Sequence, residues 1–106
     1  MKKLLWIAAC AVLIAGGPSL AANPAAGKEK SKVCVACHGP DGNSPAPDFP
    51  RLAGQHYDYL IKALSDYKSG DRKNAIMAPM AANLSQRDIE DLAAYFSRQS
   101  GLVVKY

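Results

Sequence analysis

The stretch Cys34-Val35-Ala36-Cys37-His38 holds two cysteines separated by two residues, with a histidine directly after the second. Thiols at this spacing can add across two adjacent vinyl groups of a porphyrin and leave two thioether bonds. The histidine is then held under the ring, where an imidazole nitrogen can bind iron. The motif therefore predicts one covalent haem c, attached through Cys34 and Cys37, with His38 as an iron ligand.

A bare Cys-x-x-Cys also fits two other kinds of site. A thioredoxin-like dithiol needs strands in a βαβ context, and a zinc site needs a second pair of cysteines or histidines. Outside the motif, Cys10 is the only other cysteine of the sequence and His56 the only other histidine. The haem interpretation is therefore favoured, and the redox dithiol and the zinc site stand as its alternatives.

Residues 1–22 are typical of a secretory signal peptide. Two lysines follow Met1, an apolar run extends from Leu4 to Ala15, and small residues lead to a predicted cleavage after Ala21 or Ala22. The apolar run is shorter than the ~20 residues that span a bilayer, so an uncleaved membrane anchor is the less favoured alternative. Cleavage would leave one domain, residues 23–106, located in the periplasm and without a membrane span.

The net charge of the chain limits the kinds of macromolecule that we expect it to bind. The 106 residues include 13 basic and 9 acidic side chains, a formal charge of +4. Loss of Lys2 and Lys3 with the leader lowers that charge by two, so the balance is not that of a nucleic-acid-binding protein. Lys28, Lys30 and Lys32 lie close together in sequence, and we expect either a solvated helix surface or a docking face for an acidic redox protein.

The remaining patterns predict an all-α fold of three to four short helices packed around the haem. Asn23-Pro24 can begin one helix, and apolar residues at helical spacing predict a second that ends at Gly70. Ser85-Gln86-Arg87-Asp88 is a capping box that begins the last helix. Residues 39–50 contain four prolines and two glycines, which predicts a rigid loop behind the iron ligand.

Candidate ligands and contacts lie on both sides of the second helix. Met77 and Met80 stand in an apolar loop that contains a proline, and a methionine thioether commonly fills the sixth iron position of electron-transfer cytochromes. Arg51 and Gln55 are candidate partners for the haem propionates. A carbonyl of the proline-rich loop is the expected acceptor for the other ring N–H of His38.

Three blocks in this order resemble the class I c-type cytochromes over nearly the whole predicted mature chain. They are Cys34 to Gly39, Phe49-Pro-Arg-Leu-Ala-Gly-Gln55, and Met77-Ala-Pro-Met80 with the Leu84-Ser85 helix start. The similarity is greatest to bacterial periplasmic monohaem cytochromes and to one half of the dihaem periplasmic type. Since the sequence holds one such haem motif, any second haem is expected to come from another chain.

The resemblance also implies particular residue roles. The first and last helices should cross beside the haem, with Gly27 against the face that carries Tyr95. Met77 should be the sixth ligand, with Met80 as the fallback, and the Pro47 carbonyl should accept from His38.

The function implied is that of a single-electron carrier between respiratory or oxidative redox proteins, such as a dehydrogenase and a terminal oxidase or reductase. It would not be an enzyme. The alternatives are a haem subunit of a dehydrogenase or sulfur-oxidising complex, and a small haem catalyst or gas binder with an open sixth site.

Overall fold

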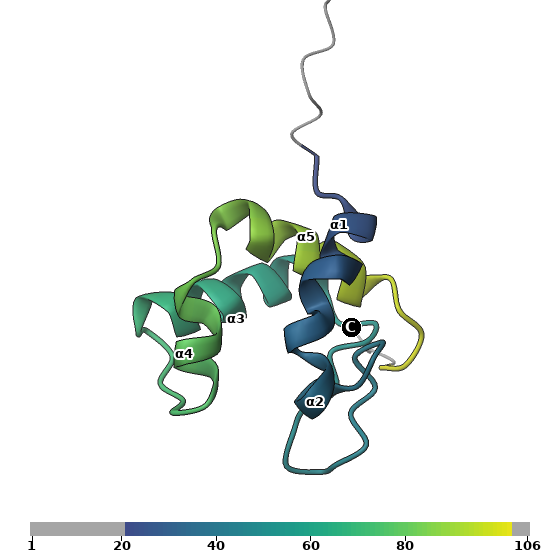
Figure 1. Ribbon diagram of the computed structural model, residues 1–106, viewed down its shortest axis with the longest axis horizontal. Coiled ribbons are helices and arrows are strands. Elements are labelled where there is room, and N and C mark those ends of the chain that lie inside the picture. The colour runs from purple at the N-terminus through teal and green to yellow at the C-terminus, as the bar shows by residue number, and fades with distance from the viewer. Residues whose placement is uncertain (1–20, 103–106) are drawn as a thin grey trace, which may run out of the picture.

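The structure is a computed structural model that describes residues 21–102, and this part of the chain forms helices and loops without a strand. The helices are α1 (Pro24–Lys30), α2 (Val35–His38), α3 (Tyr57–Ser69), α4 (Met77–Ala82) and α5 (Gln86–Ser97), with a 3₁₀ turn, η1, at Ser31–Val33 (Figure 1). The predicted all-α class is confirmed. The predicted number of helices was too low, because the haem motif and the methionine segment each form a short helix of their own.

None of the helices among residues 21–102 combines the length and the hydropathy needed to cross a bilayer. Most of the predicted signal peptide, with Cys10, lies outside the described residues, as does the tail from residue 103 onward.

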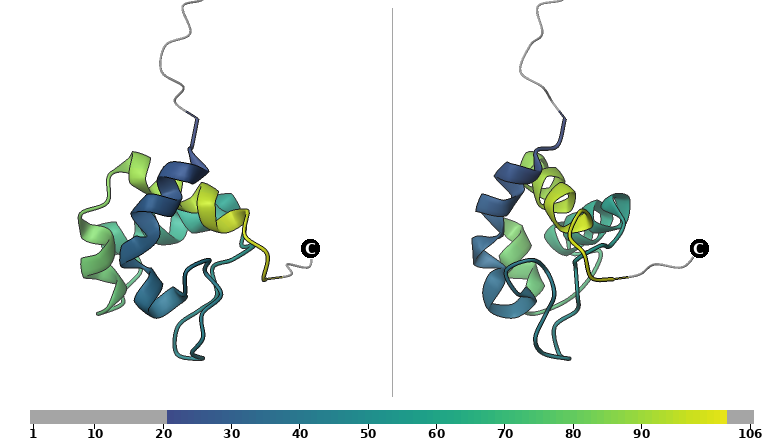
Figure 2. Two further views of the ribbon diagram at one scale, coloured as in Figure 1. Left: turned by 45° about the vertical axis from the view of Figure 1, so that its right-hand side comes forward. Right: turned by 90° about the vertical axis from the view of Figure 1, so that its right-hand side faces the viewer.

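Helices α1 and α5 cross at a glycine. A methyl group at Gly27 would lie 2.0 Å from the carbonyl oxygen of Asp91 and 2.9 Å from Cβ of Tyr95. Only a residue without a side chain lets the two backbones approach this closely. The crossing at Gly27 and Tyr95 that the family resemblance implied is therefore confirmed. Figure 2 shows α5 between α1 and α3.

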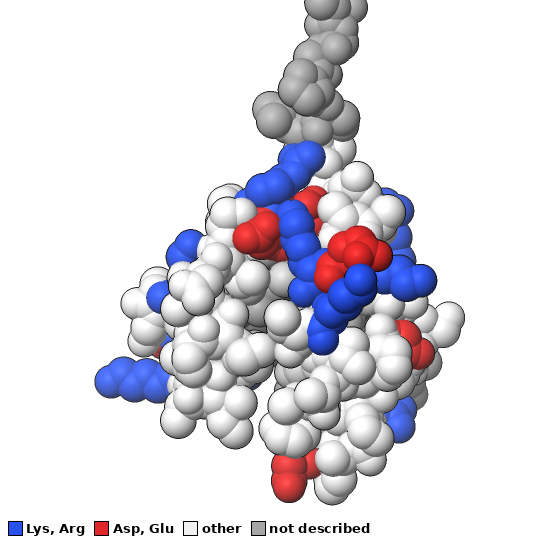
Figure 3. Space-filling view, viewed as in Figure 1, with Lys and Arg blue, Asp and Glu red and all other residues white. Residues whose placement is uncertain are grey.

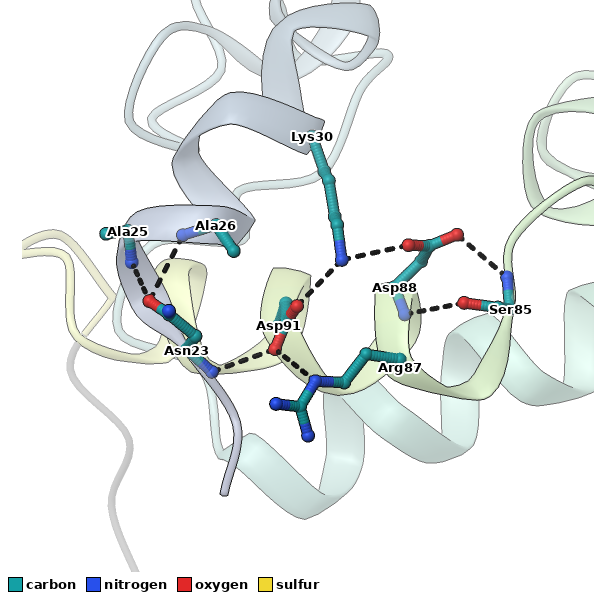
Figure 4. Close-up of polar contacts among 8 residues, drawn as sticks. All are labelled: Asn23, Ala25, Ala26, Lys30, Ser85, Arg87, Asp88 and Asp91. Atoms are coloured by element: carbon teal, nitrogen blue, oxygen red, sulfur yellow. Dashed lines mark hydrogen bonds and ion pairs between the residues drawn. The ribbon is translucent and has the colours of Figure 1, made fainter. Parts of the chain in front are cut away.

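Hydrogen bonds and ion pairs between charged groups stabilise the crossing of α1 and α5 (Figure 4). Asp91 is 2% exposed, and its carboxylate accepts from the backbone N–H of Asn23 at 2.8 Å and from Lys30 Nζ at 2.7 Å. Lys30 also pairs with Asp88 at 2.9 Å, while Arg87 Nε lies 3.6 Å from Asp91. A buried carboxylate needs such partners, because its lost hydration would otherwise destabilise the fold.

The apolar core is built mainly on α5. Its buried residues include Leu92, Ala93, Tyr95 and Phe96, which cluster with Leu60 of α3. The helix begins as predicted: the Ser85 hydroxyl accepts from the backbone of Asp88 at 3.0 Å, and the Asp88 carboxylate accepts from the backbone of Ser85 at 2.9 Å. Helix α3 ends at Gly70, whose positive φ of 88° closes the helix as predicted.

The end of α5 and the segment after it are tied to the proline-rich loop and to the residues that follow this loop. Gly54 N–H donates to the Phe96 carbonyl at 2.9 Å, and Leu102 N–H donates to the Ala53 carbonyl at 2.8 Å. The Asn43 side chain donates to the Ser100 carbonyl at 2.9 Å. These bonds close the chain into one unit, because the loop that follows the haem motif and the end of the last helix hold each other.

Candidate haem site

A cleft opens between α2 and α4. It is open to solvent at its mouth, and its inner cavity has a volume of about 170 Å³. Figure 3 shows a notch between the surface over α4 and the surface over α2, with few charged side chains around it. Its apolar lining residues include Leu52, Leu60, Leu64, Leu84, Leu92 and Phe96. An open cleft with such an apolar lining suits a planar apolar ligand.

The two cysteines are the first and the fourth residue of the five-residue haem motif. Cys34 lines the cleft and precedes α2, while Cys37 is the third residue of that helix, and both are half-buried free thiols. The backbone N–H of His38 donates to the Cys34 carbonyl at 2.9 Å, so one turn spans the motif. Burial, with a smaller contribution from Cys37, raises the pKa of the Cys34 thiol above its usual value.

His38 ends α2 and lines the cleft with a side chain only 5% exposed. Its Nδ1 lies 2.8 Å from the carbonyl oxygen of Pro50. A carbonyl can only accept, so Nδ1 carries the proton and Nε2 keeps a lone pair. The ring of Phe49 stands edge-on, 6.4 Å away between centroids. His38 is therefore oriented as a metal-binding histidine requires, with one nitrogen hydrogen-bonded and the other available.

The prediction that the Pro47 carbonyl accepts from His38 is wrong. The acceptor lies in the predicted loop, but it is Pro50, twelve residues after the histidine. The N–H groups of Leu52 and Ala53 both donate to the carbonyl of Gly42 at 2.8 and 3.2 Å, and this folds the end of the loop back under the ring. The family resemblance places the acceptor nine residues after the histidine, and it contains no information on how this particular loop closes.

Both candidate methionine ligands line the cleft, from α4. Met77 is the first residue of the helix and is half-buried, whereas Met80 is 41% exposed. The Asn74 side chain accepts from the backbone N–H of Ile76 and of Met77, both at 2.9 Å. Pro79 sits in the first turn, where a helix needs no donor, so the predicted loop is helical instead.

The predicted propionate contacts also line the cleft. Arg51 is exposed and Gln55 half-exposed at its edge. Sequence reasoning missed three further residues of the lining, Tyr59, Tyr67 and Arg72, whose side chains contact one another. It also missed Asn74, although an asparagine three residues before Met77, with a proline just beyond, is a helix-start signal.

The three lysines do not form one free surface. Lys30 pairs with two carboxylates at the crossing of α1 and α5, and its hydrogen bond to Asp91, followed by that to Asp88, raises its pKa. Lys32 pairs with Glu29 at 2.8 Å. The proposed docking face of Lys28, Lys30 and Lys32 therefore loses part of its net charge.

These features fit a covalent haem. The chemistry of the donors suits it, because the Cys34 thiol, the His38 imidazole and the thioethers of Met77 and Met80 line one apolar cleft, and Cys37 stands three residues after Cys34 in the same motif. A family model described as Cytochrome c matches residues 24–100. The chain belongs to the cytochrome c family. As a member of it, the chain carries haem c bound covalently, as the Cys-x-x-Cys-His motif predicted.

Relatives of known name agree with this assignment. Cytochrome c4 of Pseudomonas aeruginosa is 48% identical over 99 residues, which is 93% of this chain and 49% of the relative. Cytochrome c-554(548) of Halomonas halodenitrificans is 49% identical over 82 residues, 74% of this chain and 99% of the relative. The crystal structure of reduced recombinant cytochrome c4 from Pseudomonas stutzeri superposes with a TM-score of 0.74 at 51% identity, covering 78% of this chain and 48% of that one.

These matches confirm the resemblance to class I c-type cytochromes and the predicted fold. The chain spans about half the length of the cytochrome c4 relatives it matches, which agrees with the predicted similarity to one half of a longer cytochrome.

Proposed function

We propose that this protein is a periplasmic single-electron carrier whose haem iron is bound by His38 and Met77. The observation that carries the proposal is the cleft itself. An oriented imidazole from α2 and a methionine from α4 line one apolar hollow. His38 Nδ1 donates to the Pro50 carbonyl, and the backbone N–H of Met77 donates to the Asn74 side chain. When bound, haem supplies a one-electron ferric–ferrous couple. The predicted signal peptide supports the periplasmic assignment.

The chain's own residues keep the site rigid. The Pro50 carbonyl fixes the ring of His38 and increases its strength as a ligand. Met77 offers a neutral, soft sulfur, which favours ferrous iron and raises the reduction potential. With His38 and Met77 both holding the iron, little would rearrange when its charge changed, so electron transfer would need no substrate-binding step and the protein would not be an enzyme.

Partners would approach the mouth of the cleft. Three exposed apolar side chains line it: Val33, which is 64% exposed, Tyr59 and Met80. An apolar rim of this kind suits brief contact with donor and acceptor redox proteins, such as a dehydrogenase and a terminal oxidase or reductase. Arg51 and Arg72 line the cleft as well, so a partner with carboxylates around an apolar centre is the best match.

Absorption spectra of the full-length protein, matured in a periplasm, test the proposal. We expect haem that resists acidic organic extraction, sharp ferrous bands and a weak far-red band from sulfur bound to ferric iron. Haem that could be extracted would show that the predicted thioether bonds are absent. Ready binding of carbon monoxide by the ferrous wild type would show an open sixth site and favour the haem catalyst or gas binder instead.

The choice between the two methionines needs matched variants. Met77→Ala should lose the far-red band and gain carbon monoxide binding, whereas Met80→Ala should change neither. The reverse result would make Met80 the ligand. Stable co-purification of wild-type protein with a dehydrogenase would favour the subunit alternative over a freely diffusing carrier.

A further inference from the structure

Arg72 lies in the loop between α3 and α4 and lines the haem cleft. Two tyrosines of α3 hold its side chain. Nη1 donates to the Tyr59 hydroxyl at 3.2 Å, and Cζ lies 4.8 Å from the centre of the Tyr67 ring. The backbone N–H of Arg72 donates to the Asp66 carbonyl at 3.0 Å. The guanidinium is therefore fixed against α3, although its outer side is exposed.

The charge of Arg72 is not balanced by a carboxylate. Within residues 21–102, Arg72 makes no ion pair, whereas Lys30 and Lys62 each have a carboxylate within 2.9 Å. A phenol and an aromatic face hold a guanidinium without cancelling its charge. The guanidinium of an arginine is a permanent cation at neutral pH, and the hydrogen bond to Tyr59 raises the pKa of Arg72 further.

Arg51 also lines the cleft, but its guanidinium is held differently from that of Arg72. No hydrogen bond or ring contact within residues 21–102 fixes the guanidinium of Arg51. Arg51 is exposed, so its charge is screened by ions in solvent, and a propionate of the predicted kind would offset it. A cation that is held in place along an apolar wall acts more steadily on charges inside the cleft.

We propose that Arg72 is a fixed cation that raises the reduction potential of the haem in this cleft. Ferric iron carries one more positive charge than ferrous iron, so a nearby cation destabilises the ferric state more. Charge and exposure around a redox centre are among the means by which a protein sets its potential. The proposal rests on the electron-carrier function and assigns Arg72 a role beyond iron ligation and haem attachment.

Potentiometric titration of the purified haem protein tests this role. Arg72→Gln should lower the equilibrium constant for reduction about threefold to tenfold, where tenfold is ~59 mV for one electron. Arg72→Lys keeps the charge and should stay closer to wild type. The effect of Arg72→Gln should grow at low ionic strength. Lys62→Gln is the matched control, because it removes a cation of α3 that is already paired with Asp66 at 2.8 Å.

Three results would overturn the proposal. An unchanged constant in Arg72→Gln would exclude an electrostatic role. Equal losses in Arg72→Gln and Arg72→Lys would point to packing. Loss of the far-red band in Arg72→Gln would show that the residue acts through the methionine ligand. A wild type with covalent haem but no reversible one-electron couple would instead refute the proposed function, and the inference with it.

A second variant decides the question if Arg72→Gln yields no holoprotein. Tyr59→Phe removes the hydrogen bond and leaves both the charge and the ring of Tyr67 in place. A guanidinium that is less firmly held should act less on the cleft, so we expect a fall in the constant of about twofold with the far-red band unchanged. No change in the constant would refute the proposal.

Discussion

Helix α5 and the pair α3 and α4 differ in how much the protein alone completes their packing. Seven of the twelve residues of α5 are buried. In α3 one residue of thirteen is buried, Leu60, and in α4 one of six, Ala81. Protein atoms cover α5 from both sides, at α1 and at α3 (Figure 2). Apart from Leu60, the side chains of α3 and α4 that line the cleft are half-exposed or exposed.

The difference shows that the fold has two kinds of core. The crossing of α1 and α5 is specified by close backbone contact and a buried carboxylate. The cleft wall is formed by apolar side chains whose burial needs the porphyrin. A chain of this size buries a small fraction of its surface, so its stability without the porphyrin is marginal. Changes at the crossing should therefore act on stability, and changes at the cleft should act through the haem.

The largest effect is expected when the haem cannot be attached. Cys34→Ala combined with Cys37→Ala should abolish covalent haem and the cooperative thermal transition, because the cleft lining would stay in water at ~25 cal/mol per Å² of apolar surface. Circular dichroism and hydrogen exchange should show α3 and α4 losing protection before α5. Ala36→Ser, an exposed spacer substitution, is the control. An unchanged melting curve would mean that the cleft does not depend on the haem.

Gly27→Ala should have the next largest effect. A methyl group there would lie 2.0 Å from a backbone oxygen that cannot move aside, so the helices must separate, at about 1–3 kcal/mol or more. The melting temperature should fall by about 4–8 °C per kcal/mol, with the haem spectrum unchanged. Gly70→Ala places a methyl group in open space and should cost less, although Gly70 has a positive φ. Equal losses would argue against close packing at the crossing.

Acid should weaken the crossing more gently. Hydrogen bonds from the backbone of Ser85 and from Lys30 lower the pKa of Asp88 from 3.8 to about 2. A carboxyl group with a depressed pKa in the folded state stabilises the fold above its unfolded pKa, and the stabilisation is lost as pH falls. The urea midpoint should therefore drop between about pH 3.8 and about pH 2.

Asp88→Asn should flatten that pH dependence, whereas Asp58→Asn, at an exposed site on α3, should leave it as in wild type. A pH profile of Asp88→Asn that matched wild type would exclude Asp88 as its source.

The smallest effect is expected on the exposed side of α3. Lys62→Met removes an ion pair with Asp66 in which the lysine side chain is 75% exposed. Surface pairs of this kind contribute about 0.3–0.5 kcal/mol, so denaturant midpoints should barely move. A loss above about 1 kcal/mol would show that this surface of α3 takes part in the packing after all.

Local signals predicted most of the fold and part of the site. The asparagine cap, the glycine stop and the capping box each depend on a few neighbouring residues, and all three are found. The haem motif is equally local. The acceptor of His38 was misplaced because it depends on how a loop closes through Gly42, and the cage around Arg72 was missed because it joins residues thirteen positions apart. Lys30 was misjudged for the same reason, since its partners lie in α5.

The crossing at Gly27 also constrains the order of folding. The residue that covers it, Asp91, lies near the other end of the chain, and Asn23 N–H reaches the same carboxylate across a sequence separation of 68 residues. Contacts this distant in sequence close slowly and require the last helix to be present. A chain without α5 therefore cannot complete its core, and Cys34, which packs against that core, stays uncovered by it until the last helix is in place.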